Sequence, residues 1–286
     1  MYRGGPIASV SGVASVSNGG TLDLNQSSLP SIPVTLPSNV KLGRDIADVA
    51  TILTPEVNGV IFPNFEGREL SEPMITKLFR LVRSAPTGAK NWGRTEFNDM
   101  QREYLKEGIM SALSASGINA SRADLAYIME RVYLTYDLVS AVVPKGSIIN
   151  GRLCLGAAGL GERYHDDANN IVATVALSGP GTRYVASRDT DSARGSNGSY
   201  QTIGARFTED KAYKAETGEI LLMRGSFWGS SKFKETPPFL PIPGLVHRKP
   251  DPIECHSRLC FVAYTKFSNQ AWCKAKEQWD ADSLSN

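Results

Sequence analysis

The sequence lacks the long apolar runs that would place a chain in a membrane. A membrane-spanning helix needs about 20 consecutive apolar residues, and no stretch of the 286 residues approaches that length. Residues 1–16 also lack the continuous apolar segment of a secretory signal, because glycine and serine interrupt them. We therefore expect a cytoplasmic protein.

The sequence also lacks an excess of either charge. It has 31 basic and 29 acidic residues, which gives a formal net charge of +2 and no electrostatic bias toward nucleic acid or a membrane surface. With 41% hydrophobic residues, the chain is long enough to bury one large core or two small ones. We expect a flexible arm over residues 1–40, which are rich in Gly, Ser and Pro, followed by a single domain over residues 41–286.

Cysteine is scarce, and its four positions form no C-x-x-C framework. Cys255, His256 and Cys260 lie close together in the sequence, and Cys154 or Cys273 could complete a tetrahedral zinc set with them. However, Cys154 and Cys260 lie inside apolar runs, where a reduced cysteine behaves as a small hydrophobic residue. We favour reduced thiols in a reducing compartment over structural zinc.

Only three histidines are present, and two of them occur in informative surroundings. His165 and Asp167 form an H-x-D pair just before the apolar run IVATVAL, and His247 follows much later in LVHRKP. In an extended segment, residues two apart point to the same face, so His165 and Asp167 can bind one ion together. With His247 they make the ligand set of a non-haem Fe(II) centre. The alternative is that they are solvated loop residues and a hydrogen-bonded histidine, and His256 is interpreted as a loop residue.

An arginine follows His247 in the next apolar segment. Arg258 opens the alternating stretch RLCFVAYTKF, in which Arg258, Cys260, Val262 and Tyr264 share one face. A guanidinium can donate two parallel charge-assisted hydrogen bonds to a carboxylate. If this face lines the interior of a barrel, Arg258 can hold the distal carboxylate of 2-oxoglutarate while the 2-oxo acid end binds the iron. The alternative is a surface charge or an ion-pair partner.

Residues from about 42 to 141 carry helical signals. The stretch 72–85 follows Ser71 as a possible N-cap and has Pro73 in its first turn. Its apolar residues at helical spacing predict a face that packs in the core. These residues are Ile75, Leu78, Phe79 and Val82.

Two further helices are predicted in the same part of the chain. One covers residues 98–116, and the next covers 122–143 and begins at Ser121, with Asp124 placed as in a capping box. We expect four of its side chains to pack against a sheet: Ile128, Val132, Tyr133 and Tyr136. The stretch 87–95 is expected to be a loop whose Trp92 and Arg94 either reach a substrate or cap the fold.

Residues from about 146 to 268 consist of short β runs separated by turns. The expected strands are 147–155, 170–178, 182–187, 200–207, 218–225, 244–248 and 258–267. The turn 178–182 resembles a phosphate loop, but no helix follows it to bind an anion. The long connections 189–199 and 234–244 are where we expect substrate selectivity. A third metal ligand so distant in sequence suits a β-barrel or a double-stranded β-helix.

Several ordered motifs make the chain resemble the bacterial family known as domain of unknown function 1826, whose sequences suggest Fe(II)/2-oxoglutarate-like β-helix proteins. The motifs are VNGVIFPNFEGREL, YHDD followed by SGPGTRYV, GEILLMRG, GLVHRKP and the strand that Arg258 opens, together spanning about residues 40 to 268. The resemblance implies that His165, Asp167 and His247 are metal ligands and that Arg258 binds the co-substrate. Asp166 departs from the pattern, since an apolar residue is expected there.

The resemblance implies an α+β fold with a double-stranded β-helix core, also called a jelly-roll or cupin-like fold. A helical layer over about 42–141 would precede the β-helix over about 146–268. The implied function is an Fe(II)- and 2-oxoglutarate-dependent oxygenase that hydroxylates a small molecule or a peptide. The alternative is a non-catalytic metal-binding or interaction protein on the same fold, since fold does not establish activity.

Overall fold

The computed structural model describes most of the chain after residue 35. By its internal contacts the chain divides into two units, Met1–Thr35 and Leu36–Asn286, and all described residues lie in the second. They are residues 36–54, 56–85, 93–143, 145–157, 164–165, 167, 171–186, 192–194, 200–202, 212–225 and 244–265. Most of the expected N-terminal arm therefore lies outside the described residues.

The first predicted helix is confirmed as α1, Glu72–Arg83, with Pro73 in its first turn. Ser71 is its N-cap residue, but its side chain makes no capping bond within α1 and instead donates to Asp124. The expected core face is partly wrong, because Phe79 is 39% exposed whereas Met74 and Leu78 are buried. The buried stripe is centred on positions 74 and 78, and Phe79 lies about 100° around the helix from Leu78.

The other two predicted helices are present with one corrected boundary. The second begins later than expected, as a 3₁₀ turn over Arg102–Tyr104 that leads into α2, Leu105–Ala115. Asp99 has a positive φ of 49°, a left-handed conformation that cannot continue a right-handed helix. The third helix, α3, covers Arg122–Val142, and the Ser121 side chain accepts a hydrogen bond from the Asp124 backbone as predicted.

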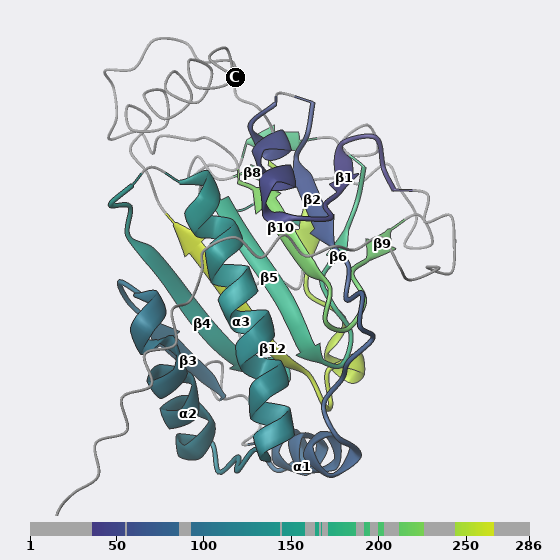
Figure 1. The fold of residues 1–286 in the computed structure, drawn as a ribbon. Helices are drawn as coiled ribbons and strands as arrows, with labels where there is room; N and C mark the ends of the chain where they lie inside the picture. Colours follow the sequence, from purple (N-terminus) through teal and green to yellow (C-terminus); the bar gives the residue numbers. More distant parts are fainter. Residues whose placement is uncertain are drawn as a thin grey trace, which may run out of the picture. The chain divides into compact units, whose positions relative to one another are not determined.

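A seven-stranded sheet forms the centre of the fold, in the order β1-β2-β10-β5-β12-β4-β3 (Figure 1). Its strands are β1 (Val40–Leu42), β2 (Gly59–Phe62), β3 (Arg94–Phe97), β4 (Ile149–Leu155), β5 (Ile171–Ser178), β10 (Ile220–Arg224) and β12 (Leu259–Thr265). Only β1 and β2 pair in parallel, and all other neighbours in this sheet are antiparallel.

Two strands of this sheet correct the expectation that residues 42–141 are helical. β2 pairs with β10 as well as with β1, and β3 pairs with β4, so each of the two segments takes hydrogen bonds from a strand far away in the sequence. Their short runs GVIF and RTEF contain β-branched and aromatic residues, which suit a strand. Arg94 thereby lies in β3 rather than in the expected loop, and Trp92 lies outside the described residues.

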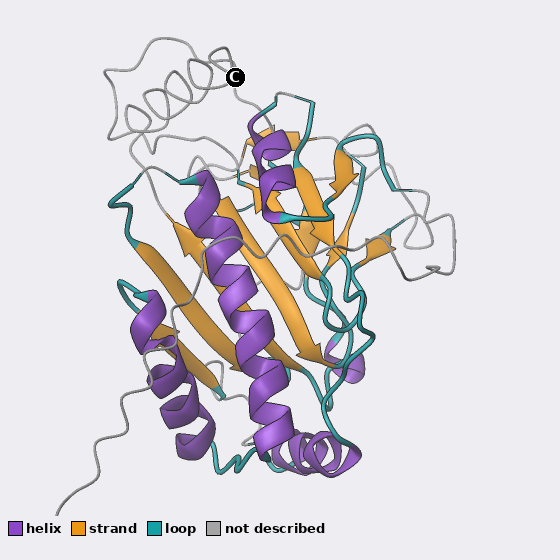
Figure 2. Ribbon diagram, viewed as in Figure 1, coloured by secondary structure: helices purple, strands orange, loops and turns teal. Residues whose placement is uncertain are grey.

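The two faces of the seven-stranded sheet pack against different groups of residues. One face packs against α3, which crosses β5 and β12 (Figure 2). Of the α3 residues expected to pack against the sheet, Ile128 and Val132 are buried in the core cluster that includes sheet residues, and Tyr133 and Tyr136 are partly buried against that cluster. The other face has a second apolar cluster that includes Val172, Met223, Cys260 and Val262. β5 is buried along its whole length. The second face is the one that carries the candidate site.

A three-stranded antiparallel sheet in the order β11-β6-β9 contributes to the second apolar cluster. Its strands are β6 (Arg183–Tyr184), β9 (Tyr213–Lys214) and β11 (His247–Arg248). Tyr184 of β6 packs in the same cluster as Leu221, Met223 and Cys260 of the large sheet. β7 (Ser192–Arg194) and β8 (Tyr200–Thr202) form a separate pair, so the expected loop 189–199 contains a strand.

The described residues confirm a mixed fold of helices and a large antiparallel sheet. The helices precede most of the strands in the sequence, but β1 and β2 come before α1, and β3 comes between α1 and α2. The closure of the strands into a double-stranded β-helix stays a prediction. None of the helices within the described ranges combines the length and the apolar character that crossing a membrane requires.

Candidate metal centre

The H-x-D segment and the third histidine meet in space although they are distant in sequence. His165 and His247 form an isolated antiparallel bridge. The His165 backbone N–H donates to the carbonyl of His247 at 2.9 Å, and the His247 N–H donates to the carbonyl of His165 at 2.8 Å. This pair of backbone hydrogen bonds fixes the two segments in register, so both imidazoles project from adjoining positions.

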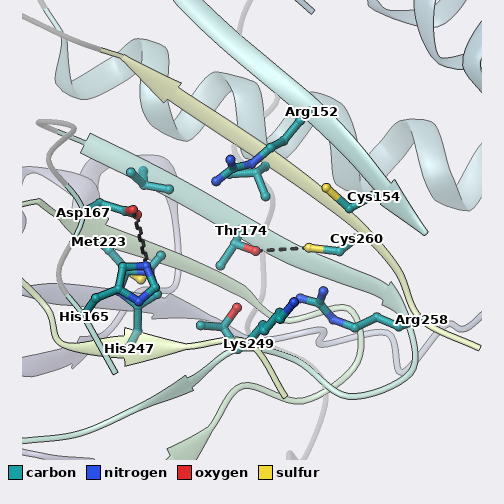
Figure 3. A pocket seen from close by; sticks show the side chains of 13 residues that line it. Arg152, Cys154, His165, Asp167, Thr174, Met223, His247, Lys249, Arg258 and Cys260 are labelled. Atoms are coloured by element: carbon teal, nitrogen blue, oxygen red, sulfur yellow. Dashed lines mark hydrogen bonds and ion pairs between the residues drawn. The ribbon is translucent and has the colours of Figure 1, made fainter. Parts of the chain in front are cut away.

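The three side chains that the sequence predicted as metal ligands point toward one another (Figure 3). His247 Nε2 lies 3.4 Å from Asp167 Oδ2, and His165 Nε2 lies 3.8 Å from Asp167 Oδ1. The ring centroids of the two histidines are 4.7 Å apart. One donor atom from each residue can be chosen so that all three lie within 4.8 Å of one another. The structure thus brings the three residues together, and their role as ligands stays a prediction.

The orientation of the His247 ring is set by the backbone beside it. His247 Nδ1 lies 2.8 Å from the carbonyl oxygen of Leu245. Because a carbonyl oxygen only accepts hydrogen bonds, Nδ1 must carry the proton. Nε2, which faces Asp167, is then the nitrogen that a cation would bind, in place of the proton through which Nε2 interacts with the Asp167 carboxylate in the metal-free site. Metal-binding histidines are commonly oriented in this way by a hydrogen bond to their other ring nitrogen.

The electrostatics of Asp167 keep its carboxyl group ionised. Burial acts to raise the pKa of Asp167, but the charge and hydrogen bond of His247 and the charge of His165 outweigh this effect. Together they lower its pKa to about 2. A carboxylate that stays charged in a half-buried position is suited to balance a bound cation.

These three residues line a pocket on the second face of the sheet, together with Arg258. Arg258 lies directly before β12 and is only 4% exposed. Its Nε donates to the carbonyl of Pro180 at 3.0 Å, in the turn 178–182. This bond leaves the terminal guanidinium nitrogens for other acceptors. The predicted arginine is therefore buried in the wall of the pocket that contains the candidate ligands.

Several pocket residues were not identified from the sequence. Lys249 lies two positions after His247, and its Nζ donates to the carbonyl of Ala157 at 2.6 Å. Arg152 comes from β4, and Thr174 comes from β5. The alternation of RLCL places Arg152 and Cys154 on one face of β4. Which face that is depends on the pairing of β4 with β12, which local sequence does not specify.

Cys154 and Cys260 line the same pocket as the candidate ligands, but neither they nor His256 belong to the group with metal-ligand geometry among the described residues. His256 lies in a turn as expected, with its ring edge-on to Phe79 at a centroid distance of 5.9 Å. Cys154 and Cys260 are direct partners across β4 and β12, while the Cys255 thiol donates to the carbonyl of Pro250. Cys273 lies outside the described residues. Within the described ranges, the grouping with metal-ligand geometry is that of the two histidines and the aspartate.

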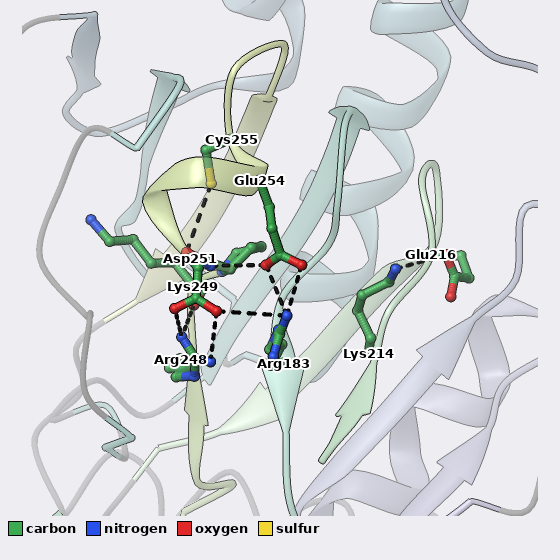
Figure 4. A network of polar contacts seen from close by, with 9 residues as sticks. Arg183, Lys214, Glu216, Arg248, Lys249, Asp251, Glu254 and Cys255 are labelled. Atoms are coloured by element: carbon green, nitrogen blue, oxygen red, sulfur yellow. Dashed lines mark hydrogen bonds and ion pairs between the residues drawn. The ribbon is translucent and has the colours of Figure 1, made fainter. Parts of the chain in front are cut away.

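A network of ion pairs joins the segments that flank the two histidines (Figure 4). Arg248 donates to both carboxylate oxygens of Asp251 at 2.8 and 3.2 Å, and its guanidinium lies 5.1 Å from the centroid of the Tyr164 ring. Arg183 of β6 pairs with Glu254 at 2.8 Å and lies 3.7 Å from Asp251. Because Tyr164 adjoins His165 and Arg248 adjoins His247, this network connects both ligand-bearing segments.

Comparisons with known proteins give a match to a family model and alignments with solved structures. A family model described as "Protein of unknown function (DUF1826)" matches residues 43–263, and a comparison with curated proteins gives no match. Among solved structures, a candidate oxygenase from Shewanella oneidensis aligns at 11% identity with a TM-score of 0.32, over 87% of this chain and 99% of that one. A full-length Neurospora crassa protein, solved in complex with alpha-KG, aligns at 9% identity with a TM-score of 0.31, over 77% of this chain and 80% of that one. At these values the likeness alone establishes neither fold nor activity.

Proposed function

The chain belongs to the DUF1826 family, and we propose that it is an Fe(II)- and 2-oxoglutarate-dependent oxygenase that hydroxylates a C–H bond of its substrate. One observation carries the proposal. The donor atoms of His165, Asp167 and His247 lie within 4.8 Å of one another, in the wall of a pocket that Arg258 also lines. Two imidazoles and one carboxylate form the ligand set of non-haem Fe(II) oxygenases and leave coordination positions open for a co-substrate.

The donor groups fit this ion in protonation state as well as in type. Leu245 holds the proton of His247 on Nδ1, so Nε2 can bind a metal, and Asp167 stays ionised. Iron(II), when bound, supplies the chemistry that couples reduction of O₂ to the oxidation of 2-oxoglutarate to succinate and CO₂ and to the conversion of a substrate C–H bond to C–OH. The three side chains would hold the ion and leave its remaining coordination positions open for the co-substrate.

Arg258 is proposed to bind the distal carboxylate of 2-oxoglutarate. Its Nε is held by the Pro180 carbonyl, so the direction of the guanidinium is fixed before any ligand binds. A buried arginine with free terminal nitrogens offers a fork that matches the two oxygens of a carboxylate. The amine of Lys249 lines the same pocket and adds a second positive charge for this dianionic co-substrate.

We also propose a fold, a domain organisation and a cellular compartment for the chain. The seven-stranded sheet and the β11-β6-β9 sheet would be the two sheets of a double-stranded β-helix, since residues of both pack in one apolar cluster. Residues 41–286 would then form a single dioxygenase-like domain. The free thiols of Cys154, Cys255 and Cys260 are buried and suit a reducing, cytoplasmic compartment.

The proposed function is tested by following succinate formation from 2-oxoglutarate in the Fe(II)-reconstituted protein under air. We expect slow succinate formation even without the substrate, and none in Asp167→Ala. Arg258→Gln should raise the 2-oxoglutarate concentration at half-maximal rate about ten- to hundredfold, as expected for the loss of charge-assisted hydrogen bonds. Full turnover in Asp167→Ala would remove that residue from the mechanism. A protein that binds the metal but never consumes 2-oxoglutarate would be the non-catalytic alternative.

A further inference from the structure

The pocket carries more positive charge than the proposed co-substrate requires. Three cationic side chains line it, Arg152, Lys249 and Arg258, against the single carboxylate of Asp167. Under the proposed function, Asp167 and the 2-oxo acid end of the co-substrate balance the metal, and Arg258 with Lys249 receives the distal carboxylate. The charge of Arg152 is then left without a counter-charge.

Arg152 enters the pocket from a different direction than the other two cations. It lies on β4, opposite Val262 of β12 and opposite Glu96 of β3. In Figure 3 its guanidinium points into the pocket above Thr174, whereas Arg258 and Lys249 lie together below Thr174.

The acidic residue closest to Arg152 in the sheet register is already occupied. Glu96 forms an ion pair with Arg94 on its own strand. The Arg152 guanidinium instead lies over the Tyr264 ring, 5.5 Å from its centroid. Among the described residues, no hydrogen bond or ion pair reaches this guanidinium. An aromatic ring can stabilise and orient an arginine while leaving its hydrogen-bond donors free.

From these contacts we propose that Arg152 binds an anionic group of the substrate, a carboxylate or a phosphate, so that the substrate is an organic acid. This inference rests on the proposed function, because it assumes that Arg258 serves the co-substrate. The planar guanidinium matches either oxyanion through two parallel hydrogen bonds.

The lining between Arg152 and the metal centre suits the carbon skeleton of such an acid. Val172, Met223 and Val262 present apolar groups to the pocket. The hydroxyl of Thr174 is hydrogen-bonded to the Cys260 thiol at 3.3 Å. It already has a partner and therefore competes little with Arg152 for the anion. An acid anchored at Arg152 would lay its C–H bonds along this apolar wall, toward His165, Asp167 and His247.

The inference is tested by calorimetric titration of two small anions, acetate and methylphosphonate, into protein saturated with Mn(II) and 2-oxoglutarate. Mn(II) avoids turnover, and saturating 2-oxoglutarate occupies the Arg258 end of the pocket. We expect at least one of the two anions to bind the wild type, and the stronger one identifies the oxyanion. Arg152→Gln should weaken that binding about ten- to hundredfold, and 2-oxoglutarate affinity should stay unchanged. Lys41→Gln, which removes one positive charge at the opposite edge of the sheet, should bind as the wild type does.

Each contrary result has a distinct meaning. Anion binding that survives Arg152→Gln, or that is absent from the wild type, would overturn the inference. Loss of 2-oxoglutarate binding in Arg152→Gln would also overturn it, because Arg152 would then be the co-substrate anchor. If the wild type binds no 2-oxoglutarate at all, the proposed function fails. In that case the same anion titration of the metal-free protein, wild type against Arg152→Gln, tests Arg152 separately.

Discussion

The turn that holds Arg258 gives a sensitive test of how the pocket is built. Gly179 has a φ of +71°, and a Cβ added there would lie 3.1 Å from the Cα and 3.2 Å from the backbone nitrogen of Arg258. In Gly179→Ala the left-handed backbone costs about 1 kcal/mol, and the contact with a backbone that cannot rotate away adds to it. We expect the free energy of unfolding to fall by about 2–3 kcal/mol in total.

The chain contains a matched control for the backbone term. Gly117, after the end of α2, has a nearly identical φ of +72°, and a Cβ there would meet nothing within 4 Å. Gly117→Ala should therefore cost only the strain of the left-handed conformation, about 1 kcal/mol. Urea unfolding of both variants gives the two values, and their difference is the cost of displacing Arg258.

The same displacement should appear in co-substrate binding. A shift of a few tenths of an ångström in Arg258 misaligns its two hydrogen bonds to a carboxylate, and a loss of about 1.4 kcal/mol corresponds to a tenfold weaker affinity. We expect Gly179→Ala to bind 2-oxoglutarate about tenfold more weakly by calorimetry on the Mn(II)-loaded protein, and Gly117→Ala to bind normally. Equal stabilities and unchanged affinity in both variants would refute this account of the turn.

Two further predictions concern parts of the fold outside the pocket. Asp124 accepts hydrogen bonds from Ser71 and Ser121 at 2.6–2.9 Å, so Asp124→Ala should lower the free energy of unfolding by about 2–3 kcal/mol in urea titrations. Burial acts to raise the pKa of Asp124, but these hydrogen bonds lower it overall. The folded pKa of Asp124 is below the unfolded value of about 3.9. The stability difference between the wild type and Asp124→Ala should therefore persist above pH 4 and disappear as the pH falls through the folded pKa. A stability difference that stays constant down to acid pH would contradict this. Arg248→Gln removes the bidentate ion pair with Asp251 beside His247. This variant should bind Mn(II) about tenfold more weakly with little change in the free energy of unfolding. Unchanged metal affinity would mean that the ion-pair network does not position His247.

Local sequence signals were sufficient where the structure is determined locally. The Ser121 cap and the apolar spacing predicted α3, and Pro73 marked the start of α1, because these features act within a few residues. The H-x-D spacing also predicted that His165 and Asp167 point to the same face, where they can bind one ion together. By contrast, Phe79 was placed in the core because an apolar residue at helical spacing can lie at the edge of the buried stripe as well as at its centre.

The remaining features depend on pairings between distant segments. β2 and β3 become strands because β10 and β4 provide their hydrogen-bond partners. No local sequence pattern predicts which segments those partners are. Arg152 reaches the pocket only because β4 pairs with β12 in a register that turns its side chain to the same face as Val262. A shift of that register by one residue would turn Arg152 to the face covered by α3.

The central claim is that His165, Asp167 and His247 bind Fe(II) in a form that accepts 2-oxoglutarate. The most direct measurement is an anaerobic titration of the metal-free protein with Fe(II) and 2-oxoglutarate, followed by the visible metal-to-ligand charge-transfer absorption. The account predicts a band in the wild type that requires both components and is absent in His247→Ala. Fe(II) binding without such a band, or a band that persists in His247→Ala, would contradict it.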